Sequence, residues 1–131
     1  MQKITIEGRL PSYNDLHTSW QKSWQIKKKA KEQVVLSALS MKPIREKVIC
    51  SIHCYEPNNK RDCDNVMSGA SKIILDALQD IGKLTNDSRR WVDLRFAPVK
   101  VDKNNPRIEV YFFDKTTDVK NADWALFWED I

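Results

Sequence analysis

Three aspartates are the residues of this chain whose types and spacing best suit catalysis. Asp62 and Asp64 stand two positions apart just before a helical pattern, and Asp87 follows that pattern. In an extended segment, residues i and i+2 project to the same side, so Asp62 and Asp64 would present neighbouring carboxylates. Such groups repel one another unless a cation lies between them, and Mg²⁺ suits a few carboxylates together with water and substrate phosphate. The spacing predicts a Mg²⁺ site, provided that the fold brings Asp87 back to the pair.

Basic residues surround this acidic pair. Lys60 and Arg61 directly precede it, and Lys72 lies two helical turns beyond it. A site that cuts phosphodiesters needs cations to hold the phosphate and acids to hold the metal, so the mixture favours such chemistry. Asp76 lies one turn beyond Lys72 and either joins the site or pairs with that lysine at (i, i+4).

A simpler interpretation of the same residues stays open. Asp64 or Asn65 caps the helix, Asp62 is solvated, and residues 86–88 form a turn. Under this interpretation the carboxylates have no catalytic role.

Charge is unevenly distributed along the chain. The net charge is +4, residues 17–47 hold eight basic and two acidic residues, and residues 114–131 hold five acids and two lysines. A basic body suits a polyanion because each neutralised phosphate releases counterions, although a lysine-rich solvated face has the same composition. The candidate phosphate contacts are Lys22, Lys27, Lys28, Lys31, Lys60, Arg61, Arg89 and Arg90.

The elements that must position these residues follow from hydrophobic periodicity. We expect strands at 3–7, 48–55, 91–99 and 107–113, helices at 20–39 and 66–81, a loop at 10–15, and a hairpin connection at 101–106. This β-α-β-α-β-β order predicts the α/β (α+β) class: one domain over residues 1–113, a mixed sheet with helices packed on it, and an acidic tail at 114–131.

Cysteine usage and hydropathy bear on compartment and metal type. The chain has three cysteines, no export-signal pattern and no apolar run long enough to cross a bilayer. We therefore expect a cytoplasmic protein with reduced thiols. Alternation places Cys50 and Cys54 on the core face of their strand and His53 on the other, which disfavours a zinc site.

Several of these motifs together resemble the RusA family of Holliday-junction resolvases. The segment Lys60-Arg61-Asp62-Cys63-Asp64-Asn65, the segment Lys72-Ile73-Ile74-Leu75-Asp76-Ala77-Leu78, and Asn86-Asp87-Ser88 carry the resemblance, with the opening loop Leu10-Pro11-Ser12-Tyr13-Asn14. The resemblance spans residues 4–113. It implies a RusA-like homodimer that depends on Mg²⁺, with Mn²⁺ as a substitute, and nicks four-way DNA junctions symmetrically to leave 5′-phosphate and 3′-hydroxyl ends.

Carried over by position, the resemblance assigns metal binding to Asp62, Asp64 and Asp87, with Asp76 as a further candidate. It assigns the catalytic lysine to Lys72 and a phosphate contact to Arg61. The chain departs from the family pattern in two places. The stretch from Asn65 to Lys72 is about four residues longer, which is close to one helical turn and keeps the direction of Lys72. Asn86 stands where a second acid often occurs.

Two other functions stay open: a non-catalytic module that binds branched DNA, and a Mg²⁺-dependent phosphohydrolase of small nucleotides. The roles of two aromatic groups are also open. Trp20 and Trp24 either pack on the sheet or a second subunit, or wedge into a junction. In the tail, Trp124, Phe127 and Trp128 have helical spacing. The tail would cover its own domain or its partner, or mimic nucleic acid over the basic groove.

Overall fold

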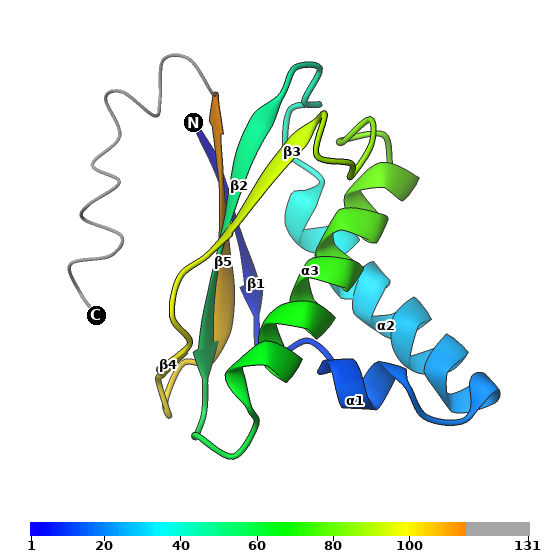
Figure 1. The fold of residues 1–131 in the computed structure, drawn as a ribbon, viewed down its shortest axis with the longest axis vertical. Helices are drawn as coiled ribbons and strands as arrows, with labels where there is room; N and C mark the ends of the chain where they lie inside the picture. The colour runs from blue at the N-terminus through cyan, green and yellow to red at the C-terminus, as the bar shows by residue number, and fades with distance from the viewer. Residues whose placement is uncertain (115–131) are drawn as a thin grey trace.

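The computed structural model describes residues 1–114 of the chain (Figure 1). The expected tail, apart from Asp114 at the end of the last strand, lies outside the described residues. The elements in chain order are β1 (Gln2–Glu7), α1 (Tyr13–Leu16), α2 (Trp20–Ala38), β2 (Val48–Glu56), α3 (Cys63–Asp80), β3 (Val92–Phe96), β4 (Lys100–Val101) and β5 (Arg107–Asp114).

The strands form one mixed sheet, as expected, in the order β1-β5-β2-β3. β5 lies between β1 and β2 and is antiparallel to both, whereas β3 runs parallel to β2. β4 extends the β3 side of the sheet by pairing in parallel with the end of β2. Over the described residues the chain is therefore a single α+β domain.

The prediction of a hairpin between the strands at 91–99 and 107–113 is wrong. β3 and β5 flank β2 on opposite sides, so they do not pair with each other. β3 is instead reached from β2 through α3, and such a helical crossover is how parallel neighbours are connected. The segment after β4 then passes the end of β2 and returns as β5.

The loop expected at 10–15 contains the short helix α1, which is a second correction. Ser12 and Asp15 form a reciprocal capping box: the Ser12 backbone N–H donates to Asp15 Oδ2 at 2.9 Å, and the Asp15 N–H donates to Ser12 Oγ at 3.3 Å. The bond from the Ser12 N–H holds the pKa of the Asp15 carboxyl below its ordinary value. The residues that favour a turn here also favour a helix start.

The helices lie on one side of the sheet, and the core fills the space between (Figure 1). α3 buries the periodic residues expected from the sequence, and Val48, Cys50, Ile52 and Cys54 face it from β2. Gly69 in α3 lies against the loop before α1, where an added Cβ would collide with the Pro11 carbonyl oxygen. This close approach joins α3 to the segment that carries Tyr13 and His17.

α3 begins three residues earlier than expected and runs unbroken to Asp80. Asp62 takes the N-cap position with extended backbone angles, and Gly82 follows the helix with a φ of 72°, the left-handed conformation that ends helices. α2 ends at Ala38, one residue before the end expected from the sequence.

Candidate functional site

Asp62 and Asp64 lie at the exposed start of α3. The Asp62 side chain makes no capping hydrogen bond, and Asp64 accepts one from the backbone N–H of Asn65 at 2.9 Å. The interpretation that Asp64 or Asn65 caps the helix is therefore wrong, because Asp62 has that position. Both carboxylates keep oxygens that face solvent.

Lys72 and Asp87 line one cavity of about 430 Å³, although they come from α3 and from the loop that follows it. The cavity lies where α1, α2 and α3 meet that loop. Its remaining walls are formed by Tyr13, Leu16, His17, Lys27, Ser68, Ser71 and Leu75. The fold thus brings Asp87 to the α3 face that carries the expected catalytic lysine.

The position of Asp64 relative to this cavity follows from helix geometry. Asp64, Ser68 and Lys72 are spaced by four residues along one unbroken helix. At 1.5 Å per residue, Asp64 is about 6 Å from Ser68 and about 12 Å from Lys72 along the axis. The spacing of four residues keeps the three side chains on one face of α3.

His17 and Tyr13 are cavity residues that sequence reasoning missed. Their rings stack with centroids 3.9 Å apart, and His17 Nδ1 lies 2.8 Å from the Tyr13 carbonyl oxygen. A carbonyl only accepts, so Nδ1 carries the proton. In the neutral ring Nε2 is then an acceptor, and the protonated ring offers a second donor.

The three candidate metal ligands do not form a ready cluster. Within residues 1–114, no group of three or more His, Cys, Asp or Glu side chains is arranged to hold a metal ion. The donor chemistry suits Mg²⁺, because Asp62, Asp64 and Asp87 offer carboxylate oxygens. These three carboxylates make no ion pair among the described residues, so they are available to a cation. The cavity that Asp87 shares with Lys72, however, is lined by neither Asp62 nor Asp64.

Asp76 is held by Lys72. The lysine Nζ lies 3.4 Å from Asp76 Oδ2 at (i, i+4), which is one of the two roles expected for this aspartate. The Lys72 side chain is largely exposed, so the pair leaves donors of its ammonium group open to a substrate phosphate.

Arg61 is engaged within the protein. Its guanidinium donates to both oxygens of Glu56, at 2.8 and 3.0 Å, and to the Leu10 carbonyl at 3.1 Å. Arg9 binds the same carboxylate at 2.8 Å. Lys31, another candidate phosphate contact, pairs with Asp80 at 2.8 Å. Among the remaining candidates, Lys27 lines the cavity, and the exposed ones are Lys22, Lys28, Lys60, Arg89 and Arg90.

Cys50, Cys54 and His53 are buried in the fold. Burial raises the pKa of the Cys50 and Cys54 thiols to about 12, so both are protonated at neutral pH. His53 lies on the opposite face of β2, where its Nε2 is 2.9 Å from Ser51 Oγ and burial lowers its pKa. Cys63 is free and exposed. This placement agrees with the expectation of reduced thiols.

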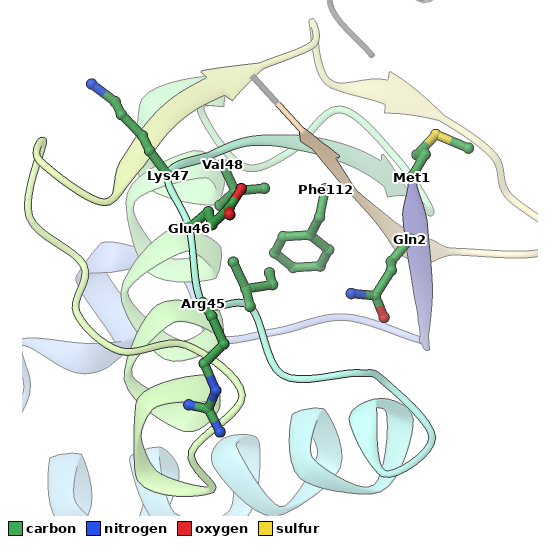
Figure 2. A pocket seen from close by; sticks show the side chains of 8 residues that line it. Met1, Gln2, Arg45, Glu46, Lys47, Val48 and Phe112 are labelled. Atoms are coloured by element: carbon green, nitrogen blue, oxygen red, sulfur yellow. The ribbon is translucent and has the colours of Figure 1, made fainter. Parts of the chain in front are cut away.

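A second cavity of about 340 Å³ lies at the other end of the sheet (Figure 2). The Phe112 ring lies between Val48 and Gln2, and Arg45 and Lys47 extend away from it. None of the candidate catalytic residues lines it, so we take the cavity of Lys72 and Asp87 as the candidate site.

Comparison with protein-family models and with curated proteins finds no match to this chain. Within residues 1–114, no helix is both long and apolar enough to cross a membrane.

Proposed function

We propose that this chain is a Mg²⁺-dependent endodeoxyribonuclease of the RusA type, which resolves four-way DNA junctions by paired symmetric nicks. The observation that carries the proposal is that Lys72 and Asp87 meet in one cavity beside Lys27. The two lysines can bind the oxygens of a phosphodiester, and the Asp87 carboxylate can help to hold a metal ion beside it. The RusA resemblance supplies the substrate class.

Asp62, Asp64 and Asp87 are the residues that would hold Mg²⁺ in this proposal. When bound, the ion would activate water and offset charge on the phosphate. Among residues 1–114 the carboxylates do not form a ready cluster for the ion. Lys27 and Lys72 would bind the phosphate oxygens from α2 and α3, and the Ser68 and Ser71 hydroxyls would donate to them.

Paired nicking needs two sites related by the symmetry of the junction. A homodimer with two-fold symmetry meets this requirement, since each subunit then faces one of two equivalent strands. The dimer therefore belongs to the proposal.

A non-catalytic module for branched DNA is the second candidate. It is favoured by one observation, the separation of Asp64 from the cavity by a helical turn. In that case the basic groups of α2 and α3 bind junction phosphates, and the carboxylates at the start of α3 are exposed to solvent and have no catalytic role. The nucleotide phosphohydrolase is the third candidate, since the cavity volume suits a single nucleotide.

Labelled four-way junctions, duplexes and free nucleotides, each with Mg²⁺ or EDTA, test these candidates. We expect the wild type to nick opposite strands of the junction with Mg²⁺ only. Asp64→Asn should not cut but should bind the junction at least as well, because a negative charge near phosphate is removed. Asp102→Asn, in the loop after β4, is the matched control and should cut normally.

Each alternative has its own signature in this assay. Tight junction binding without cutting, in wild type and Asp64→Asn alike, favours the binding module. Release of phosphate from free nucleotides with junctions left intact favours the phosphohydrolase. Cutting at an equal rate by wild type and Asp64→Asn contradicts the assignment of this aspartate.

A further inference from the structure

Two tryptophans at the start of α2 are exposed rather than packed. Trp20 is 80% exposed and Trp24 is 58% exposed. Of the expected packing on the sheet or on a second subunit, packing on the sheet is therefore wrong. Large aromatic side chains left in solvent at (i, i+4) on one helix mark a contact surface rather than part of a core.

Their surroundings are strongly basic. α2 carries five lysines and one acid, and Lys28 Nζ lies 5.3 Å from the centre of the Trp24 ring. A second copy of the same face would bring like charges together, which costs free energy. A polyanion meets complementary charge here, and an aromatic face beside cations suits an unpaired base with its phosphate.

Trp24 lies next to a residue of the candidate site. Trp24 precedes Lys27 by three residues, and Lys27 lines the cavity that holds Lys72 and Asp87. Side chains three apart on a helix are neighbours. A strand with one phosphate in the cavity can therefore continue along the first turns of α2.

We propose that Trp20 and Trp24 form a stacking surface for unpaired DNA bases, while Lys22, Lys27 and Lys28 contact the adjoining phosphates. The ligand class is DNA with unpaired bases, such as single strands or the open centre of a junction. The inference rests on the proposed function in that the ligand is DNA, but it does not require cutting.

Fluorescence anisotropy in EDTA tests the surface without cleavage. The probes are a single-stranded oligonucleotide, a four-way junction and a blunt duplex. We expect the Trp20→Ala/Trp24→Ala variant to bind the single strand and the junction about tenfold more weakly and the duplex almost unchanged. The dependence of its affinity on salt should stay that of the wild type, because no charge is removed.

Leu36→Ala/Leu39→Ala is the matched control, since these residues are 71% and 62% exposed at the other end of the same helix. It should bind all three probes as the wild type does. Trp20→Phe/Trp24→Phe should recover part of the lost affinity, because a ring is restored. Thermal unfolding of every variant should match the wild type, since the replaced side chains are exposed.

Three results would overturn the inference. They are an equal loss on duplex and single strand, no loss on any probe, and a shift from dimer to monomer in sedimentation that accounts for the weaker binding. The last result would assign the tryptophans to a subunit contact. If the wild type fails to cut junctions but the tryptophan variant still loses single-strand affinity, the nuclease proposal fails while this inference stands.

Discussion

Arg61 donates two hydrogen bonds to the carboxylate of Glu56, which is 4% exposed, at the point where β2 ends and the loop to α3 begins. Arg9 reaches the same carboxylate from the loop after β1. These contacts tie three segments together directly before Asp62. Arg61 therefore fixes the start of α3, a role that its sequence neighbourhood does not reveal.

Replacing Glu56 by Gln should destabilise the domain by about 2 kcal/mol, because two guanidinium groups lose a charged acceptor. The free energy of unfolding in urea measures this change. Glu46→Gln, at an exposed position before β2, is the control and should unfold like the wild type. Equal midpoints for wild type and Glu56→Gln would show that the buried carboxylate contributes nothing.

The same carboxylate should make stability depend on acid. Burial raises the pKa of Glu56, but the bonds from Arg61 and Arg9 outweigh burial and hold it below the ordinary value of 4.5. A lowered folded pKa contributes stability above the unfolded value, and this contribution is lost as pH falls through the folded value. Unfolding should thus become easier below about pH 4.5, and Glu56→Gln should be less sensitive there.

Gly69→Ala should destabilise the fold by about 1–3 kcal/mol. The added Cβ would meet backbone atoms of Pro11 and Ser12, which cannot swing aside as the end of a side chain could. Thermal denaturation measures the effect. Ser68→Ala, at the exposed neighbouring position, should leave the midpoint nearly unchanged, and a similarly mild Gly69→Ala would argue against this close packing.

Lys72→Gln should slow junction cutting by about 10²–10³-fold, since one preorganised cation at the phosphate is lost. The rate under single-turnover conditions measures the loss. Lys103→Gln, in the loop between β4 and β5, removes the same charge at an exposed site away from α3 and should cut normally. Equal rates for the two variants would remove Lys72 from the catalytic set.

Lys27→Gln/Lys28→Gln should weaken binding to all DNA probes and flatten its salt dependence. Two phosphate contacts contribute about 1.8 to the slope of log affinity against log salt concentration on duplex DNA and about 1.4 on a single strand. Titrations at several salt concentrations measure the slope. An unchanged slope would mean that neither lysine contacts phosphate.

Much of this fold is predictable from periodicity. The alternation of Val48, Cys50, Ile52 and Cys54 identifies β2, and the three-and-four spacing in α3 identifies its buried face. The pairing of β3 is not predictable in the same way, because adjacency along the chain favours a hairpin. Only the helix between β2 and β3 argues for a parallel pair, and the loop after β4 has the composition of a turn.

In the candidate site too, local spacing predicts some contacts and only the fold determines the others. The ion pair of Lys72 and Asp76 follows from (i, i+4) spacing within one helix. The sequence predicts that Asp87 returns to Asp62 and Asp64, whereas the cavity that Asp87 lines contains Lys72 and neither of these two aspartates. His17 joins the cavity because Gly69 allows α1 to lie against α3, and no local pattern around His17 carries that information.

α3 acts as a ruler. Its hydrogen-bonded backbone fixes the interval between the backbone positions of Asp64, at its first turn, and Lys72, near its middle. Lys72 attracts an anion whereas Asp64 repels it, so a phosphate group bound at Lys72 lies about two helical turns from a repelling charge.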